Sequence, residues 1–499
     1  MGPGVVADDA NCAGRLKLLR DWLDALIKKG PYFGYFPEPS KSFLIVDPDL
    51  VQDAQDLFCN IGVQVVTSQR LLGGHIGTAV GRSESVKRKV NFWADCITRL
   101  SEVAEKQPQD AYAALTKSLA CEWSFLQRVV SGCGADFDLL EERLVDHFIP
   151  KLFACEVNAE ERSLFELSVK LAGLALQNPA TLSDSACTTS QKAVSHLCNA
   201  ILGRGEMDVS SHNSCASSAR REAKSTRQKE HLTQFESLVQ GFPERKQRVL
   251  RGAAEHSTGT WLSVLPCAKN DSVLSPREFL DGLAMRYQKP LLQMPSSCDG
   301  CGAKFSLEHG LNCANGGNLI ERHNEVRDTT GQLAALAFSH VTREPVVREH
   351  GTGNGGALVC DLAVRGVWNT QTEALFDFRV VNTDAQSYAS RPVAAVLETV
   401  AKAKKAKHHQ ACIERRADFT PFVVSTDGVL HREAEHFLKR LAARLSAKWQ
   451  KPYSQTMFFV GVRLSVAILR ATVHCLRGAR HKMHGLFLED GAAMSLLSS

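Results

Sequence analysis

The sequence lacks the features that direct a chain into secretion or into a bilayer. No charged segment followed by an apolar stretch opens it, which excludes a secretory signal. Position 6 is Val6, where a myristoylation signal needs Ser or Thr. The most apolar late stretch, 457–476, is interrupted by Arg463 and Arg470, which would be costly at a bilayer centre. We therefore expect no membrane partner, and most of the 16 cysteines reduced and available as metal ligands.

The sequence also lacks internal repeats and a composition typical of disorder. Its 499 residues are 44% hydrophobic and 23% charged, which is globular, and they are too many for one hydrophobic core. We expect a multidomain α/β protein of roughly three units. Residues 401–490 hold 17 Lys and Arg against 7 Asp and Glu, which favours a polyanionic partner but also fits a solvated helix face.

The order of apolar patterns predicts the elements. Residues 1–80 alternate short strands with turns, with strands near 3–7, 43–47 and 62–66, and residues from 85 to 178 form a helical bundle. The Ser-rich stretch 180–232 predicts a partly ordered helix and a linker. The C-terminal part predicts a compact α/β sandwich with helix 320–339, strands 344–349, 357–364 and 373–382, helix 391–411, strand 420–426, and helices 431–449 and 454–476.

A cysteine and histidine cluster carries the spacing of a structural zinc site. In CDGCGAKFSLEHGLNC, two cysteines stand two residues apart, and a histidine and a third cysteine follow one helical turn from each other. Small buried thiols could give the same residues, but the pattern favours one metal ion. A closed four-ligand site leaves no position for water, so we expect Zn²⁺ to brace the fold rather than to catalyse. The predicted ligands are Cys298, Cys301, His309 and Cys313.

Two predicted strands carry one aspartate each, Asp361 and Asp377. Alternate side chains of a strand share a face, so Arg379 should point the same way as Asp377, with Asp361 across from them. Two carboxylates and a cation could hold Mg²⁺ for phosphodiester hydrolysis, although two aspartates facing solvent would show the same spacing. Additional candidates are Glu325, as a third carboxylate, and Lys404, Lys407 and His408 on the following helix, as phosphate contacts.

At this point the residues resemble a known family. From about 279 to 480 the chain resembles the C-terminal region of non-LTR retrotransposon proteins that carry a restriction-like endonuclease. The matching stretches are the cysteine cluster, RHNEVRD, REPVVRE, DLAVRGVW, LFDFRVVNTDAQSY, KAKKAKHHQAC, RRADFTPFVVSTDG and FLKRLAARLSAKW. The resemblance implies a zinc knuckle and a PD-(D/E)XK-like nuclease domain, with Asp361 and Asp377 as magnesium ligands.

The chain departs from that family pattern at three positions. Cys360 stands where a proline often precedes the first aspartate, and His408 stands where a tyrosine is expected. Arg379 stands at the lysine position, and arginine can stabilise charge but cannot act as a base. Lys404 or Lys407 could substitute from the neighbouring helix.

The N-terminal half resembles the same proteins further upstream. Ala7, Asp8 and Asp9 resemble the hairpin aspartates of a reverse transcriptase palm, GYFPEPSKS with Lys41 the following lysine motif, and LLGGHIG a primer-grip hairpin. The helices after them resemble the thumb. Because the chain starts six residues before Ala7, a preceding strand with a further aspartate and the fingers are not expected, and we expect no polymerase activity from this chain alone.

Together these expectations describe a nuclear, retrotransposon-derived chain with DNA and RNA as partners. The alternatives are a nucleic-acid-binding remnant without chemistry and a genomic remnant without a role. The expected domains are a partial palm (1–84), a thumb-like region (85–178), a linker and connector (179–262), the zinc-knuckle region (263–319), the endonuclease (320–480) and a tail (481–499).

Overall fold

The computed structural model describes residues 4–6, 9–256, 258–349 and 357–480, and it divides the chain into two compact units. Unit 1 comprises Met1–Glu105, Ala114–Val157 and Leu176–Thr233. Unit 2 comprises Lys106–Ala113, Asn158–Ala175 and Gln234–Ser499. Both contain helices and small sheets, so the expectation of a multidomain α/β protein is confirmed at that level. The helical stretch 85–178 contributes to both units.

The strands of unit 1 form three two-stranded sheets within the described residues. The first pair is antiparallel, and Asp9 belongs to its second strand, whereas Ala7 and Asp8 lie outside the described residues. Lys41 is exposed and pairs with Glu38 at 2.7 Å. The three expected strands are present. The pairs are β1 (Gly4–Val6) with β2 (Asp9–Asn11), β3 (Phe43–Ile45) with β4 (Gln64–Val66), and β5 (Ser68–Leu71) with β6 (Gly74–Gly77).

The long helix α3 (Ala79–Lys106) organises the helical part of unit 1. Its buried residues recur every three or four positions, from Val86 and Val90 to Trp93 and Ile97, which is the spacing of one helix face. The Trp93 ring meets Trp123 edge to face, and its indole nitrogen donates to Glu122. The other helices between residues 1 and 153 are α1 (Leu16–Lys29), α2 (Val51–Phe58), α4 (Pro108–Ala114), α5 (Ala120–Val129), α6 (Asp138–Arg143) and α7 (Ile149–Phe153).

Residues 180–232 differ from the expected linker, because two long helices occupy them. Helix α9 (Pro179–Ile201) begins at Asn178, whose side chain accepts from two backbone amides, and α10 (Val209–Gly241) follows seven residues later. Asp208 accepts from the first amides of α10. Small residues give no apolar stripe to predict from, yet Ala193, Ala216 and Ala219 pack together. The caps and this close packing stabilise helices that hydrophobic periodicity does not show.

The central sheet of unit 2 has four strands in the order β12-β11-β10-β7. Strands β10 and β11 form an antiparallel hairpin, and its turn uses Gly366 at a φ of 81°. Strands β11 and β12 are parallel and are connected through α15 (Val393–Glu414). The strands are β7 (Val341–Arg343), β10 (Leu362–Arg365), β11 (Glu373–Val381) and β12 (Asp418–Ser425), with a separate pair β8 (Val346–Arg348) and β9 (Leu358–Val359).

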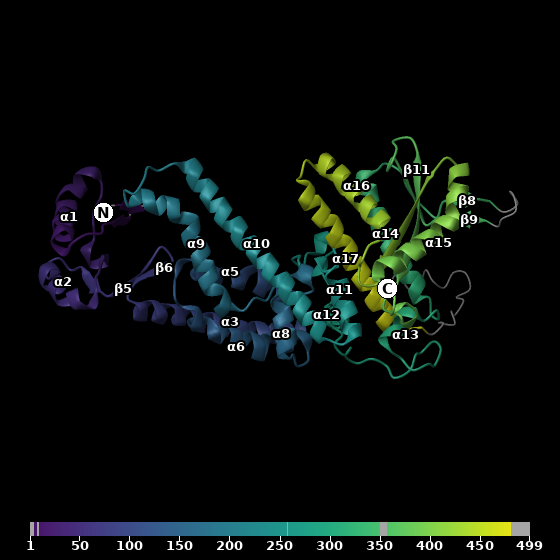
Figure 1. The fold of residues 1–499 in the computed structure, drawn as a ribbon, viewed down its shortest axis with the longest axis horizontal. Coiled ribbons are helices and arrows are strands. Elements are labelled where there is room, and N and C mark those ends of the chain that lie inside the picture. Colours follow the sequence, from purple (N-terminus) through teal and green to yellow (C-terminus); the bar gives the residue numbers. More distant parts are fainter. Residues whose placement is uncertain (1–3, 7–8, 257, 350–356, 481–499) are drawn as a thin grey trace, which may run out of the picture. The chain divides into compact units, whose positions relative to one another are not determined.

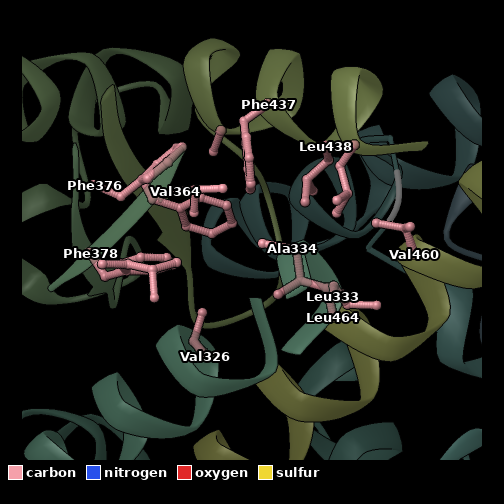
Figure 2. Packing of buried hydrophobic residues seen from close by; sticks show 14 of the residues in the cluster. Val326, Leu333, Ala334, Val364, Phe376, Phe378, Phe437, Leu438, Val460 and Leu464 are labelled. Carbon is pink, nitrogen blue, oxygen red and sulfur yellow. The ribbon is translucent and has the colours of Figure 1, made fainter. Parts of the chain in front are cut away.

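Helices cover both faces of this sheet. In Figure 1, α15 lies on one side of β11, and α14 (Asn318–Ala337), α16 (Arg432–Trp449) and α17 (Tyr453–Arg477) lie on the other. Figure 2 shows Phe376 and Phe378 of β11 in the core formed with the three-helix side. Because side chains alternate along a strand, Leu375 and Asp377 face α15. The remaining helices of this unit are α8 (Ala159–Glu166), α11 (Glu244–Ala253), α12 (Pro276–Tyr287) and α13 (Leu307–Asn312).

Helix α17 is apolar and long enough, by length and composition alone, to cross a membrane, and 67% of its apolar window is buried inside the fold. The side chains of its two mid-helix arginines reach polar partners outside the apolar core, as expected from the sequence. Arg470 pairs with Asp271 at 2.7 Å, and Arg463 donates to Gln332. The helix is therefore a core helix of unit 2, with charged side chains at its polar edge.

A buried charge cluster fixes helix α8 within unit 2. The Glu161 side chain, 6% exposed, lies 2.8 Å from Lys246 Nζ and 2.5 Å from Lys289 Nζ. It also closes a capping box with Asn158. Burial alone would raise the pKa of Glu161, but the hydrogen bonds and charges of the two lysines outweigh it and lower the pKa.

We predict that Glu161→Gln destabilises the packing of α8, because two largely covered ammonium groups lose the carboxylate that they share. Breaking a buried pair of this kind costs roughly 3–5 kcal/mol. Hydrogen exchange of the α8 and α11 amides measures this locally, which suits a chain of two units. Because the folded pKa is lowered, the wild-type advantage is present above the unfolded pKa and is lost as pH falls through the folded pKa. Glu160→Gln, at an exposed neighbour, is the control, and equal exchange in both variants would contradict the prediction.

Candidate functional site

The predicted metal ligands Cys298, Cys301, His309 and Cys313 gather in one place. One ligand atom from each lies within 4.8 Å of every other. Cys298 Sγ is 3.9 Å from Cys313 Sγ, and Cys301 Sγ is 3.4 Å from His309 Nε2. A tetrahedral zinc ion with Zn–S bonds near 2.3 Å separates two sulfurs by about 3.8 Å. The four side chains could therefore hold a metal such as zinc.

Backbone geometry explains why these residues converge. A small antiparallel bridge joins Ser297 to Lys304, and the turn between them contains Gly302 at a φ of 74°. Within it, the Cys298 amide donates to Ala303 O and the Gly302 amide donates to Cys298 O. The Ser306 hydroxyl then caps α13 by accepting from the His309 amide. The turn presents the first two thiols, and the capped helix presents the imidazole and the last thiol.

The Cys298 thiol is held in the form that a metal needs. Burial would raise its pKa, but hydrogen bonds from His309 and from the backbone of Gly300 and Cys301 outweigh this and lower the pKa to about 6. Thiolates, not thiols, bind metal ions. At Cys301 the backbone hydrogen bond of Ala303 lowers the pKa, but burial and the hydrogen bonds with Cys298 and Cys313 outweigh it and raise the pKa. The thiolate of the empty cluster is therefore favoured at Cys298.

Arg480 ties this cluster to the end of α17. Its backbone amide donates to Asp299 Oδ2 at 2.7 Å, and its guanidinium donates to Gly310 O at 3.1 Å. The same guanidinium lies over the Phe305 ring, 5.1 Å from the centroid. These contacts attach the candidate metal site to the C-terminal end of a core helix of unit 2.

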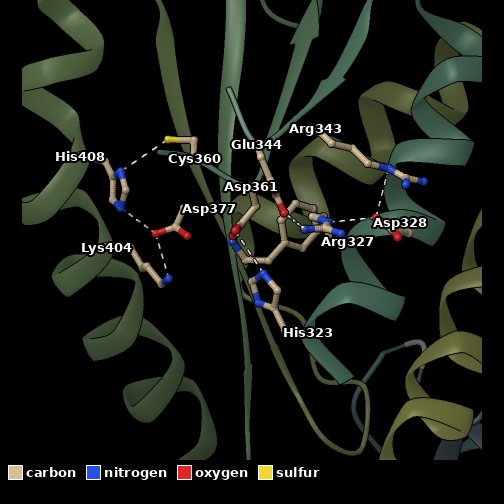
Figure 3. Close-up of polar contacts among 11 residues, drawn as sticks. His323, Arg327, Asp328, Arg343, Glu344, Cys360, Asp361, Asp377, Lys404 and His408 are labelled. Atoms are coloured by element: carbon tan, nitrogen blue, oxygen red, sulfur yellow. Dashed lines mark hydrogen bonds and ion pairs between the residues drawn. The ribbon is translucent and has the colours of Figure 1, made fainter. Parts of the chain in front are cut away.

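The two predicted aspartates lie next to each other on the sheet. The register pairs Leu362 with Phe376, so Asp361, directly before β10, stands opposite Asp377 of β11. The two carboxyl groups are electrostatic neighbours, and Asp361 Oδ2 accepts a hydrogen bond from the Phe378 amide at 2.5 Å. The Asp361 and Asp377 side chains are 20% and 8% exposed. Figure 3 shows Asp377 reaching toward α15 and Asp361 toward α14.

Helix α15 surrounds Asp377 with nitrogen atoms. Lys404 Nζ lies 2.8 Å and His408 Nε2 lies 2.9 Å from the same carboxylate oxygen. Burial would raise the pKa of Asp377, but its contacts with His408, Asp361 and Lys404 outweigh this and hold the pKa well below its usual range. Asp377 is therefore a buried, ionised carboxylate.

His408 also contacts Cys360, the residue before Asp361. Its Nδ1 is 3.4 Å from Cys360 Sγ, and its ring stacks on Phe419 at a centroid distance of 5.3 Å. Both ring nitrogens are engaged and the side chain is 1% exposed. Two of the three departures from the family pattern, at 360 and 408, are thus in direct contact.

Helix α14 supplies the neighbours of Asp361. His323 Nε2 lies 3.1 Å from Asp361 Oδ1. Arg327, one turn further along the helix, donates to Asp328 and to Glu344 in a second set of contacts that Figure 3 shows beside the pair. Asp361 is thereby held between the sheet and this helix.

The structure brings some of the predicted site residues together and leaves others apart. Lys404 contacts Asp377. Lys407 and Arg379 are exposed, and their side chains form no ion pair or hydrogen bond among the residues that the structure describes. Glu325 is exposed, and its electrostatic neighbours are Arg470, Asp271, Asp328 and Arg463.

Sequence reasoning missed the role of His323. It lies two residues before Glu325, a rotation of about 200° around an α-helix, so the two side chains leave on different sides. The signal was the pair His323 and Arg327, four residues apart on the face that meets the sheet.

No protein-family model and no curated protein sequence matches this chain.

We predict that the purified chain contains about one zinc ion, measured by elemental mass spectrometry. Cys298→Ser or Cys313→Ser should lose it, because either change leaves three ligands for a tetrahedral ion. Chelation should also speed hydrogen exchange across 297–313. Cys198→Ser, at an exposed cysteine of α9, should keep the metal. A metal-free wild-type chain, or unchanged zinc in both ligand variants, would contradict this.

Proposed function

We propose that unit 2 is a metal-dependent DNA endonuclease in which Asp361 and Asp377 hold Mg²⁺. The observation that carries this is the convergence of two carboxylates and one ammonium group, Lys404, from three separate elements. Carboxylate oxygens are the ligands that Mg²⁺ prefers, and a lowered pKa keeps Asp377 ionised for that purpose. A bound ion would polarise a phosphodiester and lower the pKa of the attacking water.

Lys404 is proposed to fulfil the role of the cation at the reacting phosphate. It is 22% exposed, so its ammonium group is partly accessible beside Asp377. Arg379, two residues after Asp377, is exposed and has no partner among the described residues. We therefore propose that Lys404, and not Lys407, takes the place of the lysine that the resemblance leads one to expect at position 379.

The wider proposal is that the chain derives from a non-LTR retrotransposon protein with a restriction-like endonuclease, acting in the nucleus on DNA and RNA. The four-residue Cys and His cluster beside an α/β sheet with two strand aspartates supports it. In unit 1, the antiparallel strand pairs β1–β2 and β5–β6 fall at the stretches that resemble the palm and the primer grip. We propose that this part corresponds to part of a reverse transcriptase.

The second candidate is a nucleic-acid-binding remnant without chemistry. Both carboxylates already have internal partners, Asp377 in Lys404 and His408, and Asp361 in His323. A set of charges compensated in this way is stable without an ion. The two candidates differ in whether a divalent ion activates the chain.

We predict that the full chain nicks supercoiled plasmid when Mg²⁺ is present and does not nick it when Mg²⁺ is omitted. Asp377→Asn should reduce the nicking rate at least ~100-fold, because the amide keeps the shape but loses the charge that holds the ion. Glu321→Gln, at an exposed residue of α14, is the control. Binding of DNA without nicking by the wild-type chain would favour the remnant instead.

A second prediction separates the two lysines. Lys404→Met should lower the nicking rate by about 10²–10³, the typical effect of removing one group that stabilises developing charge. Lys407→Met should leave the rate nearly unchanged, because Lys407 is exposed and makes no described contact near Asp377. Single-turnover gel assays at saturating enzyme measure both, and the reverse order of effects would contradict the assignment.

A further inference from the structure

A basic cleft, separate from the candidate active site, lies at the opposite end of strand β10 from Asp361. A cleft of about 530 Å³ opens there, between the end of α14, the β10–β11 turn and helix α16. No acidic residue is among the described residues that line it. Its lining comprises Ala337, Phe338, Ser339, His340, Arg365, Gly366, Thr370 and Arg444.

Two arginines of this cleft carry uncompensated charge. Arg365 and Arg444 are exposed, and neither forms an ion pair with a residue in the described ranges. The strand register places Glu373 opposite Arg365, but Glu373 pairs with Arg415 instead, at 3.5 Å. Arg444 lies over the Phe338 ring, 5.9 Å from its centroid, which orients the guanidinium at the cleft.

Helix α16 presents Arg444 at the middle of a row of cations. Arg440, Arg444 and Lys448 follow at intervals of four residues, so they share one helix face. Arg440 donates to Val367 O at 3.0 Å, and Lys448 donates to Leu336 O at 2.7 Å. The outer two cations therefore attach the helix to the walls of the cleft, and Arg444 remains for a ligand.

We propose that this cleft binds phosphate groups of a nucleic-acid backbone, as a docking surface separate from the candidate active site. Guanidinium groups bind phosphate through two parallel hydrogen bonds, and the Ser339 and Thr370 hydroxyls can donate to the same oxygens. The volume accepts a phosphate with its sugar. That the nucleic acid is the DNA to be nicked rests on the proposed function.

The spacing fits one duplex spanning both sites. Arg365 follows Asp361 by four residues, about 13 Å along a strand at about 3.3 Å per residue. The same length covers about four base-pair steps of 3.4 Å along one DNA strand. A backbone held in the cleft would thus pass the carboxylate pair within half a helical turn.

The test is the salt dependence of duplex binding by the full chain, measured by fluorescence anisotropy in Mg²⁺-free buffer without a chelator, with a labelled 30-base-pair DNA. Each phosphate contact contributes about 0.9 to the slope of log affinity against log salt. The double variant Arg365→Ala/Arg444→Ala should bind more weakly, with a slope smaller by about 1.8. Arg365→Lys/Arg444→Lys should recover most of the slope, because the charges return. Lys439→Ala on α16, which removes a cation paired with Glu435, is the matched control.

An unchanged slope in the alanine double variant, or an equal loss in Lys439→Ala, overturns the cleft assignment, and it does so even if nicking is intact. A smaller salt-dependence slope in the alanine double variant, together with no Mg²⁺-dependent nicking by the wild-type chain, supports the phosphate-binding cleft and contradicts the proposed nuclease activity. Because DNA binding is measured without Mg²⁺, failure of the cleft proposal can be distinguished from failure of the nuclease proposal.

Discussion

The feature on which unit 2 depends is one ionised carboxylate in the middle of an apolar strand. Strand β11 buries Phe376 and Phe378 on the side of α14, α16 and α17, and the alternation of side chains then forces Asp377 into the other, equally covered face. A buried carboxylate is strongly unfavourable unless it is compensated. Lys404 and His408 supply that compensation from one face of α15, so the packing of this helix on the sheet and the electrostatics of the site are a single arrangement.

The compensation extends beyond the aspartate. His408 uses its second nitrogen to contact Cys360, and Cys360 packs in one buried cluster with Cys412 of the same helix. The residue before Asp361 is thus connected, through one buried ring, to the carboxylate opposite. A substitution of Cys360 would therefore alter the surroundings of His408, which contacts Asp377. Cys360 and His408 are best understood as one structural unit, because each side chain contacts the other.

Long elements with a clear period were predictable from the sequence. The strand expected at 373–382 is Glu373–Val381, and the helix expected at 391–411 is Val393–Glu414. The convergence of the four candidate metal ligands was also predictable, since a short spacing along the chain confines them. What could not be read was which side chain of a helix meets the sheet. His323 rather than Glu325 contacts Asp361, and Lys404 rather than Lys407 contacts Asp377, because helix phase depends on packing that spacing does not encode. The Ser-rich helices α9 and α10 were missed for lack of an apolar stripe.

The contacts of the two aspartates show why the same residues suit both an empty and an occupied site. Asp377 contacts the ammonium group of Lys404 and Asp361 contacts the ring of His323, so each carboxyl group has a partner in the fold without an ion. A divalent ion held by the two carboxylates would add positive charge at the same place, where it would meet the negative charge of a phosphodiester. Lys404 and the ion would therefore compete for the Asp377 carboxylate, and this competition separates a compensated fold from a catalytic one.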